Sequence, residues 1–240
     1  MERSLVALIA LALSACSPPE TPPAEEAGPS GADSTMVVAT EARVPSDGRP
    51  VVVFLGTSLT AGLGLEREAD TYVAALDSMA TAEGLPFHAV NAGVSGETSA
   101  GGLRRLDWVL RTPLDVLFLE LGANDGLRGH DPLSTADNLQ RIVRQTQARY
   151  PEARVILAGM EAPPNLGERY TGAFRAVFTG VAESVGADLV PFVLDGVAGV
   201  PELNQPDRIH PTAEGHRRIA ENVWPVLEPH LRALHAEGGS

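Results

Sequence analysis

The chain has 240 residues, of which 44% are apolar, and its 31 acidic and 18 basic side chains give a formal net charge of −13 at pH 7. This acidic balance argues against electrostatic binding of nucleic acid and against a polybasic membrane-binding surface. The apolar content is sufficient for a hydrophobic core of one or two domains.

The N-terminus carries the pattern of an export signal. A basic residue precedes an apolar run over residues 5–13, too short to span a bilayer, and the run is followed by small residues and Cys16. The ending LSAC resembles a bacterial lipobox, in which the cysteine becomes the lipidated first residue of the mature protein. We expect removal of residues 1–15, and Ser17 favours a periplasmic location on the outer membrane. An ordinary secretory signal cleaved near Ala15 is the alternative.

Residues 16–49 are rich in Pro, Ala, Glu, Gly and Ser. A segment of this composition cannot bury enough apolar area to offset its conformational entropy, so we predict a disordered tether. A single folded domain is predicted over residues 50–236, with no internal repeat.

Strand-like and helix-like segments alternate along this domain. The predicted strands are residues 51–55, 87–91, 115–121, 154–159 and a short stretch within 187–192. The predicted helices are residues 71–83, 98–111, 134–150, 170–185 and 211–235. A kink or break is expected at Pro225, because proline removes a backbone donor. The alternation predicts right-handed βαβ units and a parallel five-stranded sheet covered on both faces.

Four polar segments follow strands or precede the last helix, where ligands bind in such sheets. They are GTSL at 56–59, NAGVSGET at 91–98, GANDG at 122–126 and DRIHP at 207–211. Each is weak evidence alone, since a serine after a strand is usually a helix cap or turn residue. Their order and placement together indicate a catalytic site.

The residue types in these segments suit acyl transfer by a serine. Ser58 needs a base within ~2.6–3.2 Å and a third group that fixes the imidazole tautomer. Asp207 and His210 stand close enough in sequence for one turn to place them together. A tetrahedral oxyanion needs preorganised donors, and the backbone N–H of Gly93, the amide of Asn124 and the N–H of Ser58 are suitable.

The segments resemble the conserved blocks of the SGNH hydrolases, also called GDSL esterases. NAGVSGETSAGGLRRL, LGANDGLRG and DRIHPTAEGHRRIA are similar to blocks of the thioesterase I/lysophospholipase L1 and arylesterase branch. The likeness extends over residues 51–235. It implies a flavodoxin-like three-layer α/β/α fold, with no metal and no other cofactor.

The same resemblance implies a role for each polar residue. Ser58 becomes the nucleophile, His210 the base and Asp207 the orienting acid. The oxyanion hole is then formed by the N–H of Ser58 together with Gly93 and Asn124.

Two further features follow from the resemblance. Residues 160–165 fall where this branch has a mobile substrate-lining loop, which assigns Met160, Pro163 and Pro164 to the substrate site. The family's aspartate before the catalytic serine is Thr57 here, which carries no charge. We expect an altered hydrogen-bond network at this position, and activity or pH dependence altered with it.

The sequence therefore predicts a serine esterase, thioesterase or lysophospholipase that forms an acyl-enzyme. The alternatives are a carbohydrate O-acetyl esterase and a non-catalytic ligand-binding lipoprotein on a degenerate hydrolase scaffold. The expected partners are a small ester or lysophospholipid substrate and a membrane reached through the lipid anchor. We expect a monomer that does not bind nucleic acid.

Overall fold

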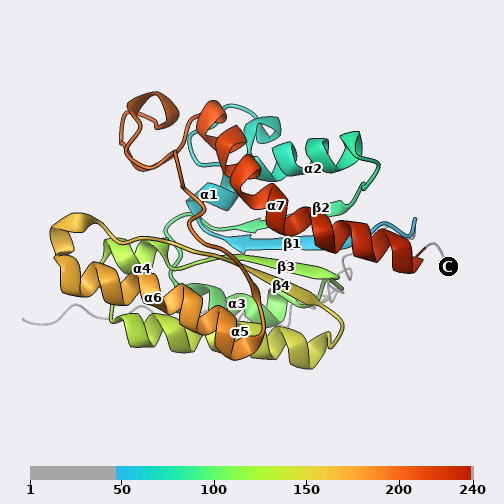
Figure 1. Cartoon of the computed structure of the whole chain (residues 1–240), viewed down its shortest axis with the longest axis horizontal. Helices are drawn as coiled ribbons and strands as arrows, with labels where there is room; N and C mark the ends of the chain where they lie inside the picture. The colour runs from blue at the N-terminus through green and yellow to red at the C-terminus, as the bar shows by residue number, and fades with distance from the viewer. Residues whose placement is uncertain (1–46, 239–240) are drawn as a thin grey trace, which may run out of the picture. The chain divides into compact units, whose positions relative to one another are not determined.

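The computed structural model describes residues 47–238 (Figure 1). The predicted signal peptide, the predicted lipidation site at Cys16 and nearly all of the predicted tether lie outside the described residues. Within the described part, no helix combines the length and apolar character needed to cross a bilayer.

A parallel five-stranded sheet with strand order β2-β1-β3-β4-β5 forms the centre of the domain. Its strands are β1 (Val51–Gly56), β2 (His88–Gly93), β3 (Val116–Glu120), β4 (Arg154–Ala158) and β5 (Asp188–Val190). This is the flavodoxin-like order, so the predicted fold class is confirmed.

Helices cover both faces of the sheet (Figure 1). One face carries α2 (Tyr72–Ala82) and α7 (Ala213–Gly238), which pack against each other. The other face carries α3 (Ser99–Val109), α5 (Pro132–Arg149) and α6 (Glu168–Val185). The short elements are α1 (Ser58–Ala61), α4 (Ala123–Leu127) and the 3-10 turns η1 (Glu68–Asp70), η2 (Pro164–Leu166) and η3 (Pro201–Leu203).

The central strands β1 and β3 are apolar on both faces and fully buried, as parallel strands between helices must be. Phe54 of β1 packs against Phe118 of β3 and against Tyr72 of α2. Threonines cap the N-termini of the flanking helices. Thr71 accepts from the N–H of Ala74 at the start of α2, and Thr98 accepts from the N–H of Gly101 at the start of α3.

The last helix differs from the expectation, because α7 runs unbroken past Pro225 and Pro229. Each proline removes one backbone donor, which costs helix stability but leaves the neighbouring hydrogen bonds in place. One face of α7 is fully buried, including Val223 and Leu227, and this packing holds the helix together across both prolines.

Short helices follow β1 and β3 directly, where the sequence indicated only turns. The first turn, α1, begins at Ser58 directly after β1, and α4 begins at Ala123 directly after β3. Strand β2 also extends to Gly93, whose partner in the register is Gly56 of β1. The predicted polar segments thus meet at the carboxyl edge of the sheet.

Candidate active site

Ser58 is the first residue of α1, at the point where the chain leaves the buried strand β1. The turn requires a glycine at position 56, because a Cβ there would lie 2.0 Å from Thr60 Oγ1 and 2.6 Å from Glu120 Oε2. As the first helical residue, Ser58 has no intrahelical acceptor for its backbone N–H. The strand and the turn together present the Ser58 hydroxyl to the edge of the sheet.

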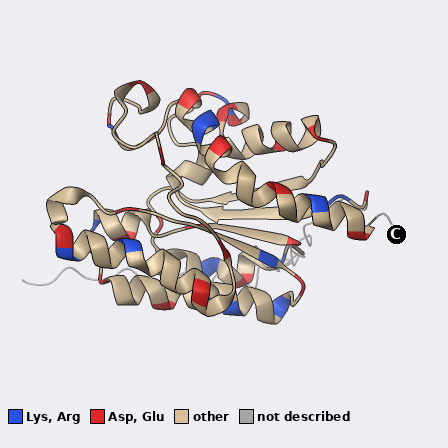
Figure 2. Ribbon diagram, viewed as in Figure 1, with Lys and Arg blue, Asp and Glu red and all other residues tan. Residues whose placement is uncertain are grey.

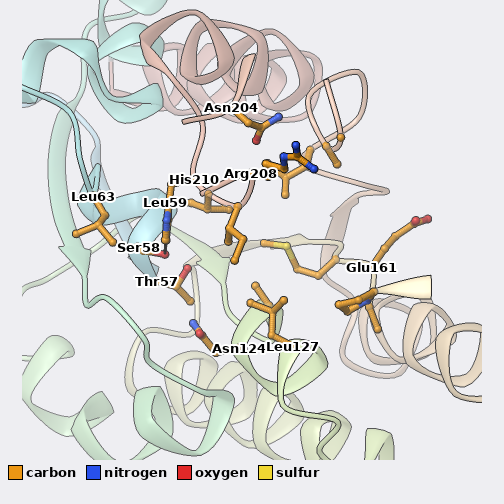
Figure 3. Close-up of a pocket in the computed structure, with 18 of the residues that line it drawn as sticks. Thr57, Ser58, Leu59, Leu63, Asn124, Leu127, Glu161, Asn204, Arg208 and His210 are labelled. Atoms are coloured by element: carbon orange, nitrogen blue, oxygen red, sulfur yellow. Dashed lines mark hydrogen bonds between the residues drawn. The ribbon is translucent and has the colours of Figure 1, made fainter. Parts of the chain in front are cut away.

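Three side chains from opposite ends of the domain form a hydrogen-bonded chain. His210 Nε2 lies 3.0 Å from Ser58 Oγ (Figure 3), and His210 Nδ1 lies 2.7 Å from Asp207 Oδ2. An ionised carboxylate can only accept, so Nδ1 carries the proton and Nε2 is left as the acceptor of the Ser58 hydroxyl. The structure therefore brings together the three residues to which the sequence assigned nucleophile, base and acid, in the geometry of a catalytic triad.

Hydrogen bonds to the His210 ring and to the local backbone keep Asp207 ionised. Its Oδ1 accepts from the N–H groups of Ile209, at 2.9 Å, and His210, at 3.0 Å. The hydrogen bond to the His210 ring, helped by these backbone donors, holds the pKa of Asp207 well below its usual range. The intervening Arg208 has φ = 62°, and among the described residues it is the one non-glycine residue with positive φ.

The predicted oxyanion donors are only partly brought together. Asn124 in α4 lines the same cavity as Ser58, and one of its two amide hydrogens is donated to the carbonyl of Glu97 at 3.0 Å. The assignment of Gly93 needs correction: Gly93 does not line this cavity, and its N–H donates to Asn91 Oδ1 at 3.0 Å.

The structure gives Gly93 a packing role in place of the predicted one. A Cβ there would lie 2.3 Å from the backbone nitrogen of Ala61, so only glycine lets β2 approach α1 this closely. Three residues later, Gly96 lines the cavity beside Ser58 and Asn124, and within the described residues its N–H has no hydrogen-bond acceptor.

The loop that carries Gly96 is fastened on two sides. Arg128 donates to the Gly96 carbonyl at 2.9 Å, and Arg105 forms an ion pair with Glu97 and also donates to the Ala92 carbonyl at 2.6 Å. These contacts fix the orientation of the Gly96 peptide relative to Asn124.

A cavity of about 770 Å³ opens beside Ser58 and His210 (Figure 3). Its walls are mainly apolar and include Leu59, Leu63, Leu127, Met160, Ala162, Pro163, Pro164, Phe192, Leu194, Ala198 and Ile209. The three residues assigned to a substrate loop are thus in the wall. Among residues 47–238, no cluster of three or more His, Cys, Asp or Glu side chains is placed to hold a metal ion.

A buried carboxyl group beneath the nucleophile was missed by the sequence analysis. Glu120 ends β3, is fully buried, and accepts from the N–H and hydroxyl groups of both Thr57 and Thr60 at 2.8–3.3 Å. Burial raises the pKa of Glu120 to about 7 against the opposing effect of these donors. The sequence signal that could have revealed it is an acidic residue near the end of the apolar run DVLFLEL.

Thr57 stands where the family has an aspartate, and its contacts with Glu120 keep the turn intact. The side chain of Thr57 is buried, and its Oγ1 donates to Glu120 Oε1 at 2.9 Å. An aspartate at this position would place a second carboxyl group against Glu120, whereas the threonine hydroxyl supplies a donor without charge. The expected alteration of the hydrogen-bond network is thus located at the Thr57–Glu120 contact.

The model of the GDSL-like lipase/acylhydrolase family matches residues 54–218, which is more than half of the chain. The chain belongs to this family. Among its relatives, esterase TesA of Pseudomonas aeruginosa is 43% identical over 181 residues, covering 75% of this chain and 89% of TesA. The thioesterase 1/protease 1/lysophospholipase L1 of Escherichia coli K12 is 34% identical over 180 residues, covering 74% of this chain and 83% of that protein.

Solved structures of family members have the same architecture. The crystal structure of TesA superposes with a TM-score of 0.71 at 41% identity, covering 75% of this chain and 99% of that one. The esterase EstA from Pseudoalteromonas, inhibited by monoethylphosphonate, has a TM-score of 0.71 at 34% identity, covering 76% and 99%. This GDSL-family member is a carboxylic ester hydrolase with the three-layer α/β/α fold.

Proposed function

We propose that the enzyme hydrolyses acyl esters and thioesters, including lysophospholipids, through an acyl-enzyme on Ser58. The observation that carries this proposal is the chain of hydrogen bonds from Ser58 through His210 to Asp207, beside an apolar cavity. Thr57, a residue of the cavity wall, and the buried Glu120 hold the turn that carries the nucleophile.

The geometry supports the following steps. His210 Nε2 accepts the proton of Ser58 as Oγ attacks the acyl carbonyl carbon, and the negative charge moves to the carbonyl oxygen. The N–H groups of Ser58 and Gly96 and the free amide hydrogen of Asn124 are placed to stabilise this oxyanion. His210 then protonates the leaving alcohol or thiol. Water attacks the carbonyl carbon of the acyl-enzyme with His210 again as the base, the bond to Ser58 Oγ breaks, and His210 returns the proton to Oγ as the carboxylic acid is released.

The walls of the cavity favour an acyl chain over a sugar. An acetylated carbohydrate needs polar partners along its ring, whereas this cavity is dominated by leucine, proline, methionine and phenylalanine side chains. Its volume of about 770 Å³ also exceeds what an acetyl group occupies. The names esterase, arylesterase and thioesterase/lysophospholipase of the relatives support the same substrate class.

A panel of p-nitrophenyl esters from acetyl to palmitoyl tests the proposed function. We expect turnover by the purified protein, with kcat/KM rising from acetyl towards medium-length chains as apolar area is buried in the cavity. Turnover of the acetyl ester alone, together with deacetylation of an acetylated polysaccharide, would replace this proposal with the carbohydrate esterase.

The variant Asn124→Ala is expected to lower kcat by about 10²–10³-fold with little change in KM, because an oxyanion donor acts on the transition state more than on the bound ester. Steady-state kinetics on the best ester of the panel measures both constants. Asn222→Ala is the control, since this amide likewise donates to backbone carbonyls, here two of them, those of Val193 and Asp195, but does not line the cavity. Equal losses in the two variants would contradict the assigned role.

The N-terminal segment supports a second proposal, export and lipid anchoring at Cys16. Expression of the full chain in a two-membrane bacterium should give a membrane-bound protein that incorporates radiolabelled palmitate. Cys16→Ser should abolish the label and release the protein from the membrane fraction. Recovery of the parent chain in the soluble periplasmic fraction without a palmitate label would favour an ordinary secretory signal.

A further inference from the structure

The cavity contains one arginine, Arg208, and the structure supplies no carboxylate for it. Within residues 47–238 its guanidinium forms no hydrogen bond and no ion pair. The neighbouring residue Asp207 binds the ring of His210, and Glu161, the acidic residue in the cavity wall, pairs with Arg175 at 2.8 Å. Arg208 is exposed to solvent where it lines this mainly apolar cavity, and an unpaired guanidinium there is available to bind an anion.

The backbone holds Arg208 in this position. Its φ of 62° lies in the left-handed region, which is adopted mainly by glycine, asparagine and aspartate. The same turn is tied on both sides, by the N–H of Arg208 to the Gln205 carbonyl at 2.8 Å and by the two backbone donors to Asp207. A bulky residue is therefore held where a small one is favoured, two residues from the base His210.

Figure 3 shows how Arg208 lies relative to the other residues of the cavity wall. Arg208 stands on the wall with His210 and Asn204, and across the cavity from it are Asn124 and Leu127. Asn204 is itself fixed, because its amide nitrogen donates to the carbonyls of Val197, at 2.6 Å, and Val200, at 2.8 Å. The apolar walls and the cationic group thus face different parts of one bound molecule.

We propose that Arg208 determines specificity for acyl esters whose alcohol portion carries an anionic oxygen group, a phosphate or a carboxylate. The inference rests on the proposed function and narrows its substrate class. The apolar walls receive the acyl chain, the ester carbonyl lies at Ser58 and Asn124, and the anionic group of the alcohol pairs with the guanidinium. Thioesters and esters of neutral alcohols remain substrates but lack this contact.

Matched substrate pairs test the proposal and separate its two anion sources. One pair is decanoylglycerol 3-phosphate and monodecanoylglycerol, and the other is decanoyl glycolate and its methyl ester, all used as monomers in solution. We expect a higher kcat/KM for the anionic member of at least one pair, lost at high salt. Asparagine tolerates the left-handed backbone, so Arg208→Asn should reduce the anionic preference, measured as the ratio of kcat/KM for the two members of a pair, about tenfold.

Two further variants keep the result interpretable. Arg208→Lys retains the charge and should keep part of the preference, and Arg144→Gln removes an exposed arginine of α5 and should keep all of it. Hydrolysis of the neutral esters with no anionic preference, or with a preference that Arg208→Asn leaves unchanged, overturns this inference alone. If Ser58→Ala hydrolyses these esters as well as the parent enzyme does, the proposed function itself fails.

Discussion

Replacing Ser58 with alanine is expected to lower kcat for acyl esters by about 10⁴-fold or more. The Ser58 hydroxyl is the atom within hydrogen-bond distance of His210 Nε2, and alanine offers no nucleophile at that position. Because the triad acts as a unit, His210→Ala should cause a similar loss, and combining the two changes should add little. Stopped assays with the best p-nitrophenyl ester, with active enzyme quantified by titration, measure the effect.

Folding and activity can be separated in this experiment. Ser78 is an exposed serine of α2 whose hydroxyl donates to the Ala74 carbonyl at 2.9 Å, so Ser78→Ala removes one hydroxyl far from the site. We expect Ser58→Ala and Ser78→Ala to unfold at nearly the same temperature while only the first loses activity. Retention of more than about one hundredth of the parent kcat by Ser58→Ala would contradict the nucleophile assignment.

The second large effect concerns the buried Glu120. Its pKa is raised from an ordinary 4.5 to about 7, chiefly because burial disfavours the charged form. The unfolded chain loses this proton near pH 4.5 and the folded protein only near pH 7. The contribution to stability is therefore fully present below pH 4.5 and is lost as pH rises to about 7, and the two pKa values correspond to a loss of about 3 kcal/mol.

We expect Glu120→Gln to remove this loss, since glutamine reproduces the protonated acid and cannot ionise. The free energy of unfolding of the variant minus that of the parent should be about 2 kcal/mol larger at pH 8 than at pH 5. Urea denaturation of both proteins at the two pH values gives the four free energies of unfolding. A difference between variant and parent that does not change with pH would contradict the raised pKa of Glu120.

The contribution of His216 to stability has the opposite pH dependence, so the effect of Glu120 is measured by comparison with Glu120→Gln. Its Nδ1 accepts from the Tyr72 N–H at 3.1 Å, and burial lowers its pKa to about 4. A depressed histidine pKa contributes stability that is present above pH 6.5 and is lost as pH falls towards 4. Between about pH 4.5 and 6.5 this effect largely offsets that of Glu120, and the parent protein should show little net slope from these two groups.

Deleting the carboxyl group is expected to have a different result from neutralising it. Glu120→Ala leaves the backbone N–H groups of Thr57 and Thr60 without their buried acceptor, at a cost of about 1–3 kcal/mol for each group. Because Thr57 precedes the nucleophile, the variant should also lose activity when it folds. A Glu120→Ala protein as stable and active as Glu120→Gln would show that the carboxyl group does not hold the turn.

The fold was predictable because its signals are local and repeated. Apolar strands alternate with helices capped by threonine, and the residues Ser58, Asp207 and His210 stand at strand exits or before the last helix, where parallel sheets bind ligands. The order of these segments along the chain was enough to place three side chains together. The expected break at Pro225 does not occur, because packing of one buried face holds α7 together. That burial is a property of the tertiary structure, which the local sequence does not show.

Details that depend on one or two residues of register could not be predicted. Gly93 is the last residue of β2 and Gly96 lies in the loop that follows, and the sequence alone does not show which of them reaches the cavity. The role of Glu120 depends on its register opposite Gly56, which the sequence does not specify. The proposed anion-binding role of Arg208 rests on a positive φ and on the lack of a partner for its guanidinium among residues 47–238, and both are properties of the three-dimensional structure.

The most direct measurement is covalent labelling of the parent enzyme with a fluorophosphonate, followed by mass spectrometry of its peptides. An activated serine reacts with this reagent and an ordinary serine hydroxyl does not, and the structurally similar esterase EstA is inhibited by a related phosphonate. We expect a single adduct on Ser58, with labelling abolished in Ser58→Ala and slowed strongly in Asp207→Asn. An adduct on another serine, or none on an enzyme that still hydrolyses esters, would contradict the assignment of Ser58, His210 and Asp207 as the catalytic triad.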